Sequence, residues 1–286
     1  MRLAVALLLL SLPLIGACTG TPPAGDLKDG ARPAASSAGP TSAPAAGEWF
    51  TDRAHEAGID FVHFNGMTGK FYQPEIMAPG VALFDYDNDG DLDVLLVQGE
   101  LLGTGTPLIP PPPGPLTDRL YRNDLEVKPD GTRVLHFTDV TSQSGLALHG
   151  YGMGVAAGDI DNDGWVDLYL TGFGRSRMFH NNGNGTFTDI TAASGTGNPS
   201  GWSVSASFVD IDRDGLLDLF VGNYLDYTLQ TDTPCFGPSG ARDYCRPEVY
   251  RGQPNRQMCR LYLTLLGKVG LNLDKFGDAR QSLTEL

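Results

Sequence analysis

The chain has 286 residues, and 34 acidic side chains against 20 basic ones give a formal net charge of −14. This acidic balance argues against nucleic-acid binding, which requires a basic face. Hydrophobic residues make up 41% of the chain, enough for a packed core, while 37 Gly and 20 Pro predict many turns and few long helices.

The N-terminal part of the chain has the composition of an export signal followed by a spacer. Residues 1–17 combine Arg2 with an almost uninterrupted apolar run. The run is shorter than the roughly 20 apolar residues of a membrane span, so it indicates a signal peptide. Residues 18–47 consist almost wholly of Thr, Pro, Ala, Gly and Ser, which predicts a disordered linker.

The junction between signal and linker resembles the lipobox of bacterial lipoproteins. It reads Ile-Gly-Ala-Cys and ends at Cys18. The resemblance implies that Cys18 is lipidated and becomes the new N-terminus. We therefore expect an exported lipoprotein, tethered to the bacterial outer membrane, in the periplasm or at the cell surface. An ordinary signal peptide that contains a cysteine is the alternative.

Three segments of the remaining chain align with one another and define an internal repeat of about 50 residues. Residues 81–99, 155–173 and 206–224 each carry an acidic run that leads directly into a compact apolar run. A Phe-Thr-Asp motif recurs as well, at residues 50–52, 137–139 and 187–189. Short β-prone runs separated by Gly, Asn and Asp are typical of strands joined by tight turns.

The apolar runs predict the fold class. Residues 94–97, 168–170 and 219–221 are expected to be inner strands covered on both sides, and no window has a competing helical period. Repeats of this length with several strands each favour the blades of a β-propeller. We expect an all-β fold, a partial propeller of about three to four blades over residues 48–258, with the Pro-rich stretch 101–118 as a surface loop.

The acidic runs have the ligand spacing of a cation site. Carboxylates recur at offsets 1, 3, 5 and 9 of each run, with a Gly at offset 6 for the sharp turn. The residue at offset 7 can add its backbone carbonyl. Oxygen-only ligation favours Ca²⁺ over Mg²⁺ and disfavours Zn²⁺. A solvated acidic turn is the alternative, but three loops with equal offsets favour about three Ca²⁺ ions. The predicted ligand residues are Asp85, Asp87, Asp89, Asp91, Asp93, Asp159, Asp161, Asp163, Trp165, Asp167, Asp210, Asp212, Asp214, Leu216 and Asp218.

An EF-hand is the rival interpretation of such loops, and it fails on two counts. Its loop needs a Glu at offset 12, where this chain has Leu96, Leu170 and Val221, and it needs flanking helices where this chain predicts a strand. The loops instead resemble the calcium hairpins of the FG-GAP/VCBS repeat, the blade unit of integrin-α-type propellers. With the Phe-Thr-Asp motif and the Leu-Tyr-Arg-Asn of residues 120–123, they are similar to the bacterial cartilage acidic protein-like family, whose members often end in an ASPIC/UnbV domain.

The chain departs from that family after the third repeat. A complete propeller of the family implies about seven blades, whereas three clear repeats and the opening of a fourth are present. Residues 259–286 form a divergent tail in which only Leu261 and Tyr262 resemble the repeat. We expect a truncated or frameshifted gene product, with a natural short form as the alternative. An open arc of blades would expose strand edges and allow self-association.

The cysteines predict a disulfide, and the remaining motifs give no sign of a catalytic or haem site. Cys235 and Cys245 lie ten residues apart in a Pro/Gly-rich insertion, where an exported protein is expected to form a disulfide, as the family resemblance also implies. Two free buried thiols are the alternative, and Cys259 is left over. The histidines lack metal-ligand spacing, and no nucleophile-elbow or haem-attachment motif is present.

Together these features predict a calcium-binding, exported or surface-tethered repeat protein that acts as an adhesion-type scaffold without catalysis. The resemblance implies a protein or glycan partner, contacted through loops such as 101–118 and 228–250. Two alternatives stay open: a propeller-type enzyme that acts on polysaccharide, and a non-functional remnant.

Overall fold

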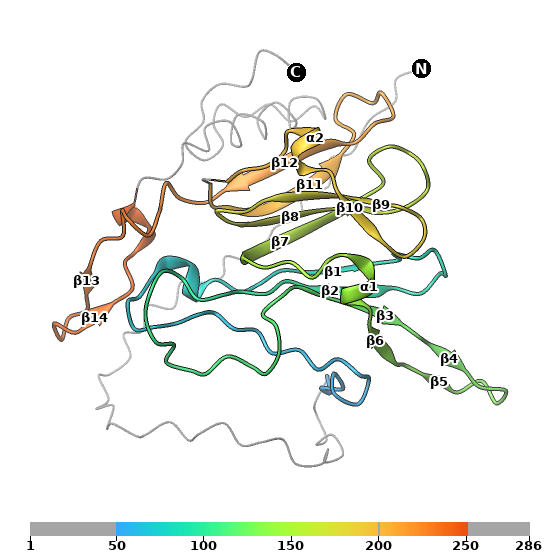
Figure 1. Cartoon of the computed structure of the whole chain (residues 1–286), viewed down its shortest axis with the longest axis horizontal. Helices are drawn as coiled ribbons and strands as arrows, with labels where there is room; N and C mark the ends of the chain where they lie inside the picture. Colours follow the sequence, from blue (N-terminus) through green and yellow to red (C-terminus); the bar gives the residue numbers. More distant parts are fainter. Residues whose placement is uncertain (1–49, 200, 251–286) are drawn as a thin grey trace, which may run out of the picture. The chain divides into compact units, whose positions relative to one another are not determined.

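The computed structural model describes residues 50–199 and 201–250. These residues form antiparallel sheets connected by turns and by helical segments of three or four residues (Figure 1). The all-β prediction is therefore confirmed, and the described residues contain no closed propeller. The predicted signal peptide, the predicted linker with Cys18 and the divergent tail with Cys259 lie outside the described residues.

The first repeat forms a four-stranded antiparallel sheet, called sheet 1. Its strands run in the order β1-β2-β3-β6, and the β1–β2 hairpin places Val81 opposite Leu96 and Phe84 opposite Asp93. A small hairpin, β4–β5, extends the connection between β3 and β6. The bounds are β1 Val81–Phe84, β2 Asp93–Leu96, β3 Arg119–Asn123, β4 Glu126–Val127, β5 Arg133–Val134 and β6 Phe137–Asp139.

The second repeat forms sheet 2 with the same connectivity, and the third forms the two-stranded sheet 3. The strand order is β7-β8-β9-β10 in sheet 2, and β11 pairs with β12 in sheet 3. The first strands lie next to one another, since β7 contacts both β1 and β11. The bounds are β7 Tyr151–Gly158, β8 Asp167–Phe173, β9 Arg177–Asn181, β10 Phe187–Asp189, β11 Ser203–Val209 and β12 Asp218–Asn223.

The remaining elements are short. Two one-turn α-helices follow the fourth strands of sheets 1 and 2, and a two-stranded hairpin follows sheet 3. Among the described residues, no helix combines the length and the apolar character needed to cross a membrane. The bounds are η1 Gln73–Ile76, α1 Thr141–Ser144, α2 Thr191–Ser194, β13 Cys235–Phe236, β14 Arg242–Asp243 and η2 Pro247–Val249.

The predicted inner strands correspond to β2, β8 and β12. Strands β2 and β8 each have a hydrogen-bonded neighbour on both sides and are almost wholly buried, as predicted. Strand β12 is only half-buried, because β11 is its single partner among the described residues. The Pro-rich insertion 101–118 is mostly exposed, although Leu102 and Asp118 at its ends are buried.

The Phe-Thr-Asp motif forms the fourth strand of sheets 1 and 2 and fixes the turn that follows. Asp139 Oδ1 accepts the amide of Thr141 at 2.9 Å, and Asp139 Oδ2 lies 3.1 Å from Nη1 of Arg119 at the start of β3. Asp189 makes the same two contacts with the equivalent residues of sheet 2. The motif recurs because one aspartate both closes a turn and pairs the third strand with the fourth.

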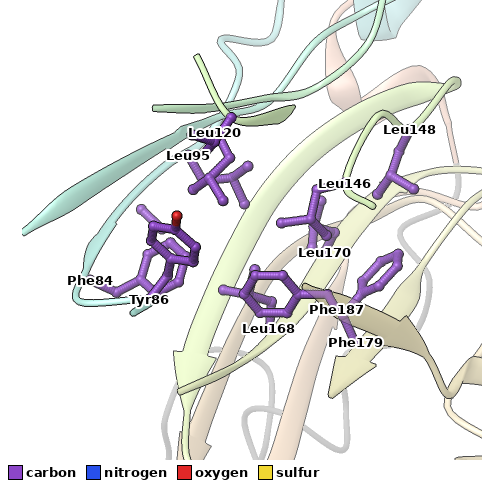
Figure 2. Packing of buried hydrophobic residues seen from close by; sticks show 12 residues of the cluster. Phe84, Tyr86, Leu95, Leu120, Leu146, Leu148, Leu168, Leu170, Phe179 and Phe187 are labelled. Atoms are coloured by element: carbon purple, nitrogen blue, oxygen red, sulfur yellow. The ribbon is translucent and has the colours of Figure 1, made fainter. Parts of the chain in front are cut away.

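The main hydrophobic core lies between sheets 1 and 2. Figure 2 shows side chains of the first sheet and its loop facing side chains of β8, β9 and β10, with residues from the α1–β7 connection beside them. Alternation along the strands directs these residues to one face. The labelled core residues are Phe84, Tyr86, Leu95, Leu120, Leu146, Leu148, Leu168, Leu170, Phe179 and Phe187.

A second core joins sheets 2 and 3 to the segment after β12. It is rich in aromatic rings and centres on Trp202, whose ring lies 5.6 Å from Phe173 and 5.5 Å from Tyr227. The sulfur atoms of Cys235 and Cys245 are bonded in the structure at 2.05 Å and contact this core. The 228–250 insertion is thereby fixed against the sheets.

Buried polar contacts connect the first repeat to the second. The fully buried Asn181 donates from Nδ2 to the carbonyl of Tyr86 at 2.9 Å, and to that of Val166 in its own repeat at 3.2 Å. A buried ion pair adds a second link, since Arg175 Nη2 lies 2.7 Å from Asp118 Oδ2. Because buried polar groups lose water, these bonds fix the relative placement of the two repeats.

Replacing Asn181 tests the link between repeats. We expect Asn181→Ala to lower the free energy of unfolding by about 2–3 kcal/mol, because it leaves buried carbonyls without donors. Asn123→Ala is the matched control, since Asn123 occupies the same strand position but donates only within its own repeat, to Leu92. Its cost should be about 1 kcal/mol. Equal losses in urea unfolding would contradict the assignment.

Candidate metal centres

Each of the three acidic runs forms the turn between the first two strands of its sheet. We call them loop 1 (residues 85–93), loop 2 (159–167) and loop 3 (210–218). In every loop the carboxylates at offsets 1, 3 and 9 converge, with ligand atoms that all lie within 4.8 Å of one another. The three sets are Asp85, Asp87 and Asp93; Asp159, Asp161 and Asp167; and Asp210, Asp212 and Asp218.

The backbone of each loop takes two left-handed residues. One is the predicted glycine at offset 6, for example Gly90 with φ of 93°. The other stands at offset 4 and is Asn88, Asn162 or Arg213, with φ between 57° and 65°. Left-handed backbone is accessible to Gly and tolerated by Asn, so it explains the Asn-Asp-Gly order of the first two loops.

The aspartate at offset 9 ties its loop to the sheet. Asp93 Oδ2 accepts the amide of Tyr86 at 2.9 Å, and Asp93 Oδ1 accepts the amide of Asn123 on β3 at 2.8 Å. Asp167 makes the equivalent bonds in sheet 2, to Ile160 at 3.0 Å and to Asn181 at 2.7 Å. Both aspartates are fully buried, so these amide bonds are what orients their carboxylates.

The residues at offsets 5 and 7 form a second turn inside each loop. The offset-5 carboxylate accepts the amide of the offset-7 residue, at 2.8–2.9 Å. Only in loop 2 does the offset-5 residue, Asp163, also belong to a converging group. The carbonyl ligands expected at offset 7, from Asp91, Trp165 and Leu216, stay a prediction.

Burial and mutual repulsion disfavour ionisation of the clustered carboxylates. Burial raises the pKa of Asp93 to about 6, against the amide bonds from Tyr86 and Asn123. Burial also raises the pKa of Asp87, with further contributions from Asp89 and Asp85, and it raises the pKa of Asp167. A cation at these positions would reverse the shifts by stabilising the charged forms.

One group near loop 2 was missed in the sequence. His180 Nδ1 lies 3.2 Å from Asp167 Oδ1 and 3.5 Å from Asp161 Oδ2. The histidine is the fourth residue of β9, and the equivalent residue of β3 is Arg122. Its position in the sequence has no regular spacing from the aspartates, so the sequence alone did not predict that it lies beside the loop. Alignment of the third strands would have flagged the position, because its side chain faces the loop in both sheets.

The loops are also bonded to one another. Asn88 Nδ2 donates to the carbonyl of Gly164 at 2.9 Å, and Asn162 Nδ2 donates to that of Gly215 at 2.8 Å. Each offset-4 amide thus reaches the offset-6 glycine of the next repeat. A change in the conformation of one loop therefore alters a hydrogen bond to the next loop.

The donor set fits a hard divalent cation. The converging groups of loops 1 and 3 consist of carboxylate oxygens only, as Ca²⁺ prefers. Asp87 Oδ1 is buried and has no hydrogen-bond partner among the described residues, which is the state expected of a metal ligand without its ion. The arrangement can hold a cation and can use it to brace each hairpin.

Comparison with known proteins agrees with this geometry. The FG-GAP-like repeat family matches residues 159–221, which span loops 2 and 3. Cartilage acidic protein 1 of Mus musculus is 29% identical over 141 residues, or 49% of this chain and 22% of that protein. The protein of the same name from Homo sapiens is 28% identical over 141 residues, covering 49% and 21%.

The match therefore spans about a fifth of the length of these curated relatives. The family match covers loop 2, strands β8–β11, loop 3 and most of β12. Residues 159–221 of this chain are therefore similar to the FG-GAP-like repeat.

Proposed function

We propose that this chain is an exported, calcium-binding repeat protein that serves as an adhesion-type scaffold without catalysis. The FG-GAP repeat supports a surface scaffold of this type. The observation that carries the calcium proposal is the threefold recurrence of converging carboxylates at equal offsets. Clustered carboxylates repel one another, so their repetition without cations would only destabilise the hairpins.

The proposed ion has a structural role. It would neutralise the three carboxylates of a loop and hold the first two strands of a repeat together. Because Asp93 and Asp167 also bond to the third strand, the ion would brace three strands at once. A ligand that binds only the folded state stabilises that state.

The location and the partners are part of the proposal. We propose that the chain is exported to the bacterial outer membrane, periplasm or cell surface and tethered there by a lipid on Cys18. Its partner would be a protein or glycan, reached through loops 101–118 and 228–250. Strand edges without a partner would further allow self-association.

Calcium titration tests the central claim. We expect calorimetry on the full chain to show about three Ca²⁺ ions per chain, one for each loop. Each site should stabilise the folded state by about 2.7 kcal/mol at a calcium concentration 100 times its Kd. Asp161→Asn should remove one ion, while Asp226→Asn, at an exposed carboxylate outside the loops, should remove none. A chain whose melting temperature is equal in calcium and in chelator would refute the proposal.

The buried aspartates also predict how stability depends on pH. In chelator, Asp93 has a pKa of about 6 in the folded chain, against an ordinary value of 3.8. Its contribution to stability is therefore fully present below pH 3.8 and is lost as the pH rises through about 6. Asp87 and Asp167 shift in the same direction.

We expect the free energy of unfolding in chelator to fall with rising pH by about 2 kcal/mol more in the wild type than in Asp93→Asn. Saturating calcium should abolish this fall, because the ion holds the carboxylates charged. Urea unfolding between pH 4 and pH 7 measures the difference. Parallel curves for the two proteins in chelator would show that Asp93 does not titrate as described.

Replacement of Cys18 tests the tether. Cys18→Ser should move the chain from the membrane fraction of a bacterial host to the soluble fraction, and mass spectrometry should show the acyl mass on the wild type only. Cys259→Ser is the matched control and should leave the fractionation unchanged. Wild-type chain found only in the soluble fraction would exclude the anchor.

A further inference from the structure

A pocket of about 490 Å³ lies between the first and second repeats, next to loop 1. Its walls come from loop 1, strand β3, helix α1, the offset-7 residue of loop 2 and the β9–β10 turn. Residues from two repeats meet here because Asn88 of loop 1 is bonded to Gly164 of loop 2. The pocket is therefore fixed by the contact between the loops.

Trp165 forms one wall of the pocket and is its most distinctive residue. The ring is half-buried and lies against Gly183, where a β-carbon in place of the glycine hydrogen would come within 2.8 Å of the indole. Glycine at 183 thus makes room for the ring. The equivalent offset-7 residues of loops 1 and 3 are Asp91 and Leu216, so the aromatic wall is particular to this pair of repeats.

Hydrogen-bonding groups surround the ring. The side chain of Gln143 on α1 is exposed and has no partner among the described residues. Asn184 uses its Oδ1 to accept from Thr186, at 3.1 Å from the amide and 2.6 Å from the hydroxyl, which leaves its amide nitrogen available within the described part. In sheet 2 the helical position of Gln143 is taken by Ala193, so the next repeat lacks this donor and acceptor.

The charge of the pocket is balanced. Arg122 donates from Nε to Asp124 Oδ1 at 2.7 Å, so its guanidinium is already paired. Asp87 contributes a carboxylate to loop 1 and also lines the pocket. With a cation in loop 1, neither sign of charge dominates, and a charged ligand gains little.

We propose that this pocket binds a neutral glycan, through stacking on Trp165 and hydrogen bonds to Gln143 and Asn184. A single aromatic wall amid amide groups matches a pyranose ring, which offers an apolar face and a rim of hydroxyls. The volume of about 490 Å³ lies in the range of small-molecule sites. The inference rests on the proposed function and specifies its partner class and place.

An ion bound in loop 1 would take part in this site. Asp87 Oδ1 is buried without a hydrogen-bond partner among the described residues, and Asp87 belongs both to the converging carboxylates and to the pocket wall. Because Asp87 lines the pocket, a cation held by loop 1 would be open to sugar hydroxyls as further oxygen ligands. We therefore expect glycan binding to require calcium in loop 1 and not in loop 3.

The test is calorimetry with the full, calcium-saturated chain in a detergent without a sugar head group. Cellobiose, maltose and N,N′-diacetylchitobiose serve as probes. We expect at least one to bind, Trp165→Ala to weaken that binding about tenfold, and Trp165→Phe to keep most of it. No binding of any probe, or equal binding by Trp165→Ala, overturns the proposal.

Two loop variants separate the ion's local role from its effect on stability. Asp87→Asn and Asp212→Asn each remove the offset-3 ligand of one loop, but only Asp87 lines the pocket. Only the first should lower sugar affinity, by about tenfold, while both lose one ion. Equal sugar affinities overturn the calcium requirement. A chain that binds three ions but no sugar refutes this inference and leaves the proposed function intact.

Discussion

In the first two repeats, the buried aspartate at offset 9 is the constraint on which the repeat depends. It closes its own loop, accepts an amide from the third strand and supplies a carboxylate to the proposed cation site. In sheet 1 these roles fall on Asp93, which is fully buried and whose pKa is raised to about 6. Without a cation, burial disfavours the charged form of this carboxylate. A cation beside it would favour the charged form and so stabilise the folded chain. The fold and the proposed metal site are therefore not separable, since the same side chain contributes to both.

The repeats are coupled in series through polar contacts that follow one pattern. The side-chain amide at offset 4 reaches the next loop, and Asn181 of β9 reaches back to loop 1. Asn123, at the same position of β3, has no earlier described repeat to contact, and its Oδ1 is buried without a partner among the described residues. In a linear array of this kind, stability is the sum of a contribution from each repeat and a contribution from each interface between neighbours. Removing the proposed ion of one loop would therefore also weaken the adjacent interface.

Much of this could be predicted from the sequence, because it is local. The loop offsets, the glycine turn and the strands after the loops follow from spacing alone, and the structure confirms β2 and β8 as two-sided strands. What could not be predicted depends on which strand lies beside which loop. His180 meets loop 2 only because β9 pairs with β8, and Asp118 meets Arg175 only because an 18-residue insertion folds back. Such contacts carry no fixed spacing along the chain.

The three acidic loops share their carboxylates but differ in the side chain at offset 7. The converging carboxylates are identical in the three loops, whereas offset 7 holds Asp91, Trp165 or Leu216. The offset-7 residue contributes to the turn through its backbone amide, which donates to the offset-5 carboxylate. Its side chain can therefore vary without disturbing the turn. A side chain that is held firmly but not required by the fold is well suited to ligand recognition. Trp165 meets that condition: the loop fixes its backbone, and Gly183 on the neighbouring turn makes space for its ring.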